Sequence, residues 1–310
     1  MSIEPKLYVH GAKFHLDDLL CSAMGKILGY EIERTLDNDI CEKIGPKDIV
    51  CDFGKRYDGV KFFDHHQSTA PYSQKVGLNT RFPFAKVAAA GLLWAARGAD
   101  VIKAVDPRVP KECIQEAIDT IDQMLIAPSD KIDTGGDIDI PNGVCTLSSA
   151  ISACNPISQN LKDSDAEFFK MLPFVVNILK AHIEKVLNTI YGKKTIDNAP
   201  ILDGKIIVLS KYTPWTTTVV SNQKFDNCLF CVYPSNRGGW NAQVIPNING
   251  KGARKFFPIE WIGCQSNAET AKAMGFNYDH GDNFFCHEGR WIISVPTKDM
   301  AIEACRKAML

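Results

Sequence analysis

The first hundred residues alternate between short apolar runs and amphipathic stretches, and this alternation constrains the fold more than any other feature. Leu16, Leu19, Leu20, Met24 and Ile27 recur at helical spacing within residues 15–29, and Gly29 suits the helix end. A second, alanine-rich stretch, 84–98, also predicts a helix that ends at Gly98. Short strands are expected around the first of these helices, at 6–11, 30–35, 47–54 and 60–66. Such alternation predicts an α/β fold with a largely parallel sheet and flanking helices.

The remaining sequence indicates a second, smaller domain. Residues 110–127 and 165–194 predict helices, the second with a possible kink at Pro173, and the acidic, turn-rich stretch 128–143 predicts a solvated loop. Beyond a linker at 198–206, strand-like runs such as "CLFCVYP" and "GWNAQVIP" mix with helical ones such as "NAETAKAMG". We therefore expect domains at 1–197 and 198–310, the second of the α+β class.

Composition excludes several functional classes. The 310 residues hold no apolar stretch near the ~18 residues that span a bilayer, and residues 1–20 lack the pattern of a signal or transit peptide. We expect no membrane association and a cytoplasmic location. A net charge of −1 gives no overall basic field for long nucleic acids, although a local basic groove stays open. Among eleven cysteines only "CLFC" has CxxC spacing, and it reads as a buried strand.

Polar side chains gather where the predicted strands of the first domain end. The ends of three such strands supply histidines and aspartates, namely His10, His15, Asp17, Asp18, Asp52, Asp64, His65 and His66. Open α/β sheets bind ligands beyond the carboxyl ends of their strands. The helix at 110–127 adds Asp119 and Asp122 beside an apolar stripe, where an aspartate needs a partner.

These residue types favour hard or borderline divalent cations. Carboxylates and imidazoles without thiolates suit Mn²⁺ or Mg²⁺. Two clustered ions can hold a bridging hydroxide and stabilise a phosphoryl centre, and Asp52 is placed to bridge them. Taken singly, the residues have plainer explanations: Asp17 and Asp18 could cap a helix, Asp52 could open a turn, and His10 could be an ordinary strand-end histidine. Their order and spacing favour the metal site.

The ordered motifs resemble the DHH phosphoesterase superfamily, and within it the melanocyte-proliferating-gene-one exonuclease family. Eight segments carry the resemblance across about residues 6 to 300: "HGAKFHLDD", "DFGKRYD", "FDHHQ", "AAAGLLW", "IDTIDQ", "LSSAISACNP", "GGWNAQVIP" and "FCHEGRWI". Gly11 stands where the family often has aspartate, and Gln123 where it has asparagine.

The resemblance implies a two-metal site in a cleft between a DHH domain and a DHHA-like domain. The implied metal ligands are His10, His15, Asp17, Asp52, His65 and Asp122, with Asp52 bridging two ions, Mn²⁺ favoured over Mg²⁺. Three further residues are implied near the chemistry: Asp18 as a further ligand, Asp64 as an orienting residue and His66 at the phosphate. In the second domain, His287 and Arg290 would grip substrate phosphate, Gly289 would allow close approach, and Arg237 is a weaker candidate. An exposed hairpin turn also accounts for "CHEGRW".

The function implied by the resemblance is that of a phosphodiesterase, a 3′–5′ exonuclease acting on RNA or short oligonucleotides. A metal-bound hydroxide would attack phosphorus in line. Two alternatives stay open: a small-molecule phosphoesterase or pyrophosphatase, and a non-catalytic binding protein that keeps the fold. Eukaryotic relatives reach the nucleus and mitochondria, and the sequence leaves the oligomeric state open.

Overall fold

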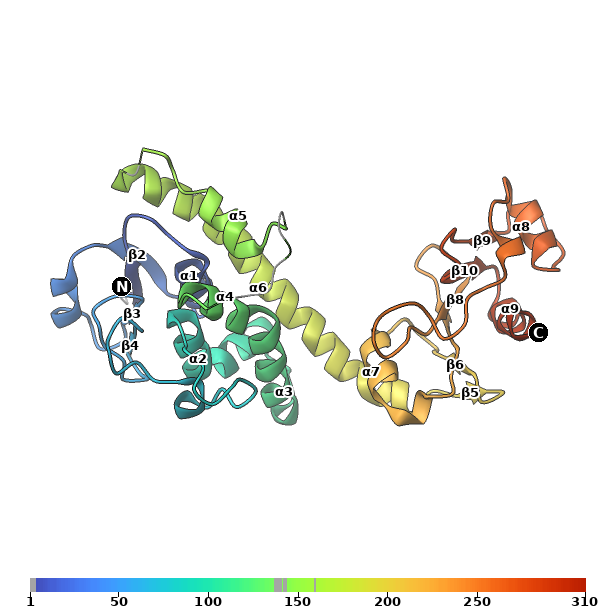
Figure 1. The fold of residues 1–310 in the computed structure, drawn as a ribbon, viewed down its shortest axis with the longest axis horizontal. Helices are drawn as coiled ribbons and strands as arrows, with labels where there is room; N and C mark the ends of the chain where they lie inside the picture. Colours follow the sequence, from blue (N-terminus) through green and yellow to red (C-terminus); the bar gives the residue numbers. More distant parts are fainter. Residues whose placement is uncertain (1–3, 137–140, 142–143, 159) are drawn as a thin grey trace. The chain divides into compact units, whose positions relative to one another are not determined.

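The computed structural model describes residues 4–136, 141, 144–158 and 160–310. It divides into two compact units, Met1–Leu187 and Asn188–Leu310, coloured blue to green and yellow to red in Figure 1. The division falls inside helix α6 (Leu161–Asp197), ten residues before the boundary after residue 197 expected from the sequence.

The first unit is built on a four-stranded parallel sheet. Its strands are β1 (Lys6–His10), β2 (Glu31–Thr35), β3 (Ile49–Cys51) and β4 (Phe62–Phe63), in the order β2-β1-β3-β4. All three pairings are parallel, which confirms the α/β prediction. In this order, β2 lies on one side of β1, and β3 and β4 lie on its other side. The carboxyl ends of β1 and β3 therefore flank a topological switch point, where open α/β sheets bind ligands.

Two helices pack on each other and on this sheet (Figure 1). Helix α1 (Leu16–Ile27) ends where predicted, because Gly29 adopts a left-handed φ of 86°. Helix α2 (Ala89–Val105) begins later than predicted and runs past Gly98. Buried Val101 and Ile102 continue its apolar face, and the missing side chain of Gly98 leaves room for the ring of Trp94, 3.1 Å from where a Cβ would lie.

The prediction of a solvated loop at 128–143 is wrong in its first part, because residues 128–133 are helical. Helix α3 (Lys111–Ile121) continues through a π-helical segment (Asp122–Ile126) into helix α4 (Ala127–Asp133). Pro128 lies in the first turn of α4, directly after the π-helical segment. Residues 137–140, 142 and 143 of the expected loop lie outside the described residues. Short helix α5 (Leu147–Ala153) then precedes α6 (Leu161–Asp197), which contains Pro173 and extends beyond the predicted 165–194.

The second unit is a mixed sheet with short helices, as predicted for an α+β domain. Its strand order is β5-β6-β7-β8-β10-β9, and only the pairing of β6 with β7 is parallel. The strands are β5 (Ile201–Leu202), β6 (Ile206–Val208), β7 (Phe230–Pro234), β8 (Trp240–Val244), β9 (Phe285–Cys286) and β10 (Ile292–Val295). The helices are α7 (Thr216–Ser221), α8 (Asn267–Ala273) and α9 (Lys298–Met309).

Both faces of this second sheet are covered. Ile206 and Val208 pack with α9 in one cluster, while the intervening Ile207 packs with Trp215 in the other. Cys231 is fully buried in β7 and Cys228 just before it, so "CLFC" is core rather than an exposed motif. Among the described residues, no helix combines the length and the apolarity that a membrane crossing requires.

Candidate metal centre

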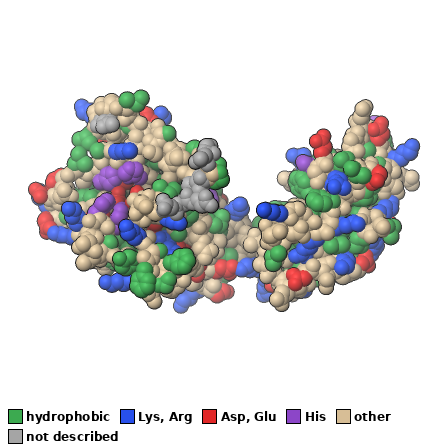
Figure 2. Space-filling view, viewed as in Figure 1, with side chains coloured by type: hydrophobic (Ala, Val, Ile, Leu, Met, Phe, Trp, Pro, Cys, Tyr) green, Lys and Arg blue, Asp and Glu red, His purple; other side chains and the backbone are tan. Residues whose placement is uncertain are grey.

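Four segments of the first unit bring histidines and aspartates into one hollow. His10 ends β1, His15 precedes α1, Asp52 follows β3, and the triplet 64–66 follows β4. Figure 2 shows the purple histidines gathered around red carboxylates in a depression of this unit. The cavity has a volume of about 740 Å³, and these side chains line it. The strand-end residues singled out by the sequence therefore meet at one site.

Asp52 occupies the centre of the site in an unusual backbone conformation. Its φ is 64°, in the left-handed region that aspartate tolerates better than most residues, and Gly54 follows with a φ of 88°. The side chain is buried, with Oδ2 3.1 Å from His10 Nε2 and Oδ1 3.5 Å from His65 Nδ1. The sharp turn after β3 thus places one carboxylate between imidazoles that come from two different strands.

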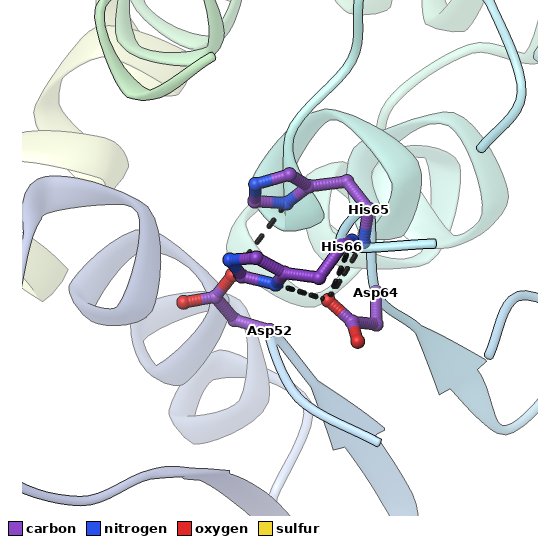
Figure 3. Close-up of side chains that lie close together, drawn as sticks. All are labelled: Asp52, Asp64, His65 and His66. Atoms are coloured by element: carbon purple, nitrogen blue, oxygen red, sulfur yellow. Dashed lines mark hydrogen bonds and ion pairs between the residues drawn. The ribbon is translucent and has the colours of Figure 1, made fainter. Parts of the chain in front are cut away.

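Asp64 holds the two adjacent histidines in place (Figure 3). Its buried Oδ1 accepts hydrogen bonds from the backbone N–H of His65 at 2.7 Å and of His66 at 3.2 Å, and it lies 2.7 Å from His66 Nδ1. Its Oδ2 accepts from the Lys55 N–H at 2.5 Å. The two imidazole rings stack with centroids 4.3 Å apart. Asp64 therefore fixes both the loop and the ring of His66, and its orienting role at a metal centre stays a prediction.

The start of α1 contributes two buried carboxylates. Asp18 Oδ2 accepts from the His15 N–H at 2.8 Å, and its Oδ1 lies 3.0 Å from His10 Nε2. Asp17 Oδ1 accepts from the N–H of Ala90 at 2.8 Å. Because Ala88 caps α2 without a side-chain acceptor, Asp17 satisfies one of the free N–H groups at that helix start. One oxygen of Asp17 is thus used structurally, and the other faces the site.

Three sets of side chains have the spacing of metal ligands. In each set, one donor atom per residue lies within 4.8 Å of all the others. The sets are His10, His15 and Asp18; Asp17, Asp52, His65 and Asp133; and Asp52, Asp64, His65 and His66. Each predicted ligand except Asp122 belongs to one of them, and Asp133 is a member that the sequence reasoning missed.

Four buried atoms of these sets form no well-aligned hydrogen bond: Asp17 Oδ2, Asp18 Oδ1, Asp52 Oδ1 and His65 Nδ1. Asp18 Oδ1 has only its ion-pair contact with His10 Nε2, and Asp52 Oδ1 and His65 Nδ1 face each other at 3.5 Å. Buried polar atoms are normally satisfied, because leaving one unpaired costs about 1–3 kcal/mol. A divalent cation would satisfy carboxylate oxygens and an imidazole nitrogen at once. The residues present therefore fit a site for hard or borderline divalent ions.

The electrostatics of the cluster also favour added positive charge. Burial and the charge of Asp52 raise the pKa of Asp17 well above its usual range, and burial and the charge of Asp18 do the same for Asp52. Burial alone would lower the pKa of His10, but hydrogen bonds and charges from Asp18 and Asp52 outweigh it and raise that pKa to about 11. Burial and neighbouring His66 lower the pKa of His65. The cluster thus concentrates carboxylates that need a cation.

Asp133 and Asp122 come from two copies of one short pattern. The chain reads D-x-I-D at 119–122 and again at 130–133, 11 residues later, which is three helical turns. Asp133 Oδ2 lies 3.3 Å from His65 Nε2. Asp122 instead binds Arg81 through both oxygens, at 2.6 and 2.8 Å. The sequence signal for the missed residue was therefore this second copy, followed by Thr134 and Gly135.

A buried ion cluster holds α4 against α2. Asp130 Oδ2 lies 2.6 Å from Arg81 Nη1, and its Oδ1 accepts from the Gly91 N–H at 3.1 Å. A Cβ on Gly91 would come within 1.8 Å of Asp130 Oδ2, so only glycine fits there. Burial raises the pKa of Asp130 to about 7 even though Arg81 lowers it. Asp133 follows one turn later in the same helix, so this cluster sets its position.

Three of the four predicted substrate residues of the second unit, His287, Gly289 and Arg290, lie in one hairpin turn between β9 and β10. The Arg290 N–H donates to the His287 carbonyl at 2.7 Å, and the Gly289 N–H donates to His287 Nδ1 at 2.9 Å. Arg290 has a φ of 56°, and its guanidinium lies 5.3 Å from the ring centroid of Phe256. Arg237 is exposed in a separate turn between β7 and β8. Their contact with substrate stays a prediction.

Known proteins resemble this chain over nearly its full length. The MYG1 protein C694.04c of Schizosaccharomyces pombe is 23% identical in an alignment of length 330, which covers 98% of this chain and 97% of the relative. The MYG1 protein YER156C of Saccharomyces cerevisiae is 24% identical over 274 residues, 78% of each chain. Among solved structures, the pGpG-specific phosphodiesterase PggH from Vibrio cholerae is 15% identical and aligns over 99% of this chain and 97% of its own. Its TM-score is only 0.25, so no conclusion follows from that match.

A protein-family profile also matches nearly the whole chain. The sequence profile named for the MYG1 exonuclease, described as an uncharacterised protein family (UPF0160), matches residues 6–309. This range takes in both units and all of the strand-end histidines and aspartates described above. The chain therefore belongs to the MYG1 exonuclease family.

Proposed function

We propose that this protein is a metal-dependent phosphodiesterase that removes nucleotides from the 3′ end of RNA or short oligonucleotides, in RNA processing. The family supports a metal-dependent phosphoesterase, and the finer substrate and direction are part of the proposal. One observation carries it: buried ligand atoms of Asp17, Asp18, Asp52 and His65 form no well-aligned hydrogen bond and belong to clusters with metal-ligand spacing, and Asp52 and His65 line an open cavity. A polar site of this kind is costly unless it binds a cation.

The proposed centre holds two ions, Mn²⁺ in preference to Mg²⁺. The first ion would use the set of His10, His15 and Asp18, and the second the set of Asp17, Asp52, His65 and Asp133. Asp52 is placed to serve both, because its Oδ2 is 3.1 Å from His10 and its Oδ1 is 3.5 Å from His65. Bound divalent ions supply Lewis-acid stabilisation of phosphoryl oxygens and lower the pKa of water. We place Asp133 in the ligand position first predicted for Asp122, because Arg81 uses both oxygens of Asp122.

Residues around the ions would bind and orient the substrate. The side chain of His66 is 52% exposed in the cavity, and Asp64 holds its Nδ1, so its Nε2 is the ring atom available to a phosphate oxygen. Lys55 lines the same cavity and adds positive charge near that phosphate, whereas the neighbouring Arg56 is paired with Glu42. His287 and Arg290, supported by the close approach that Gly289 permits, are proposed to contact substrate phosphate as well, with Arg237 as a weaker contributor.

A panel of substrates tests this function. Purified protein is assayed with Mn²⁺, with Mg²⁺ and with chelator on a short RNA, the matching DNA, a dinucleotide and pyrophosphate. We expect metal-dependent shortening of RNA from its 3′ end, and loss of both activity and bound metal in Asp52→Asn with the fold intact. Turnover of pyrophosphate alone would replace the exonuclease proposal with a small-molecule phosphoesterase. Absence of both metal binding and turnover would indicate a binding protein, and activity of Asp52→Asn within tenfold of wild type would reject its bridging role.

A further inference from the structure

A second cavity adjoins the metal centre through a smaller one. The smaller cavity, about 340 Å³, shares His65, His66 and Asp133 with the cavity of the metal centre. It shares Lys86 and Thr134 with a further cavity of about 640 Å³, formed by the segment 80–86 and by residues of α4 and its ends. The larger cavity is in the range of small-ligand pockets. A substrate anchored at the metal centre could therefore extend into it.

The lining of this larger cavity combines aromatic and cationic groups. Phe82 lines it and is 88% exposed, and Phe84, two residues on, is 77% exposed. Lys86 and Lys131 also line it and are exposed, and neither forms an ion pair within the described part of the chain. Of its described lining residues, none is an aspartate or a glutamate. The cavity thus suits an anionic ligand with a flat apolar part.

The exposed Phe82 belongs to a well-braced segment rather than a loose loop. The Ser73 hydroxyl donates to the Phe82 carbonyl, and the Ser73 N–H donates to the Ala85 carbonyl at 3.1 Å. Tyr72 pairs with Lys86 through an antiparallel bridge. An ordered backbone that presents a large aromatic ring to solvent lowers the entropic cost of binding a ligand against it. Figure 2 shows hydrophobic side chains on the same face of this unit as the histidines.

We propose that this cavity is the nucleoside subsite of the enzyme and receives the base next to the scissile phosphate. The inference rests on the proposed function and names the part of the substrate that the site selects. The base stacks on Phe82, and Lys86, which lines both the connecting and the larger cavity, contacts the phosphate that joins them. Lys131 also lines the larger cavity and supplies a second cation for a further phosphate. Stacking of this kind tolerates any base, as a trimming exonuclease requires.

Direct binding measurements separate the base contact from the phosphate contact. The probes are a fluorescein-labelled, phosphorothioate-linked RNA trinucleotide and its abasic counterpart, each titrated with full-length protein in Mn²⁺. We expect Phe82→Ala to weaken binding of the trinucleotide by roughly 5- to 150-fold, the range of base stacking, and to leave the abasic probe unchanged. Lys86→Ala should weaken both probes alike and reduce the salt dependence. Phe174→Ala and Lys103→Ala, exposed residues outside these cavities, are the matched controls.

The outcomes distinguish this proposal from the function on which it rests. If Phe82→Ala weakens both probes equally, or neither, the nucleoside subsite is rejected even when the wild type degrades RNA. If the wild type degrades no phosphodiester, the proposed function fails, and the binding titrations still decide whether the cavity takes a base. In an active enzyme, Phe82→Ala should raise KM for a short RNA with kcat unchanged. A fall confined to kcat would place Phe82 outside the subsite.

Discussion

Replacing Arg81 by methionine should destabilise the first unit strongly. The Arg81 side chain is 6% exposed, and its partners Asp122 and Asp130 are each 1% exposed. Methionine fills similar space but leaves two buried carboxylates without their cation. Breaking a buried ion pair from one side costs about 3–5 kcal/mol, because the remaining charge is uncompensated. At about 2–4 °C per kcal/mol for a unit of this size, the melting temperature should fall by roughly 6–20 °C.

The matched control is Arg97→Met. Arg97 forms a partly exposed pair with Asp100, at 2.9 Å, and losing such a pair costs about 0–1 kcal/mol. Differential scanning calorimetry of the full chain measures both variants. A loss in Arg81→Met no greater than in Arg97→Met would refute the buried cluster as a stabilising element.

The loss of stability caused by Arg81→Met should depend on pH. The folded-state pKa of Asp130 is about 7, above its usual 3.8, because burial outweighs the lowering influence of Arg81. The stability that this carboxyl contributes is present in full below about pH 4 and is lost as the pH rises through 7. Without Arg81 the pKa rises further, so the cost of the substitution should be larger at pH 8 than at pH 5.5. An equal cost at both pH values would contradict this reasoning.

Three other predictions follow from the site. The Asp133→Asn variant should lose bound metal and keep the wild-type melting temperature in chelator. The Asp122→Asn variant should keep its metal and melt at a lower temperature. If metal analysis and calorimetry gave the reverse pattern, Asp122 rather than Asp133 would be the ligand. Since the pKa values of Asp17 and Asp52 are raised without metal, metal uptake should release protons and tighten as pH rises, which calorimetric titration in buffers of different ionisation enthalpy measures. His287→Ala should raise KM for a short RNA, and a loss seen only in kcat would contradict phosphate contact.

Local patterns were enough to predict the parallel sheet and the gathering of polar residues at its edge. Strand periodicity and helix ends depend on only a few neighbouring residues. Strand β1 and helix α1 therefore lie where the sequence predicts them. Because parallel strands end at one edge, His10 and Asp52 could be placed together without any knowledge of tertiary contacts. The left-handed φ of Asp52 was not predictable from its identity alone.

The choice between Asp122 and Asp133 was beyond sequence reasoning for a physical reason. Both end the same D-x-I-D pattern, and the helical period puts them on nearly one face. The selection depends on Arg81, 41 residues before Asp122, which pairs with Asp122 and thereby removes it from the site. The start of α4 was misjudged as a loop for the same reason, since Asp130 is buried only through its long-range partners.

The most direct test of the account is the number of ions that the protein binds. Native mass spectrometry of wild type and Asp52→Asn at increasing Mn²⁺ measures the stoichiometry of the centre. The account predicts two ions per chain in the wild type, and loss of both in Asp52→Asn because this carboxylate lies between the two ligand sets. A wild type that takes up no ion at saturating Mn²⁺, or an Asp52→Asn protein that retains both, would contradict a two-metal phosphodiesterase.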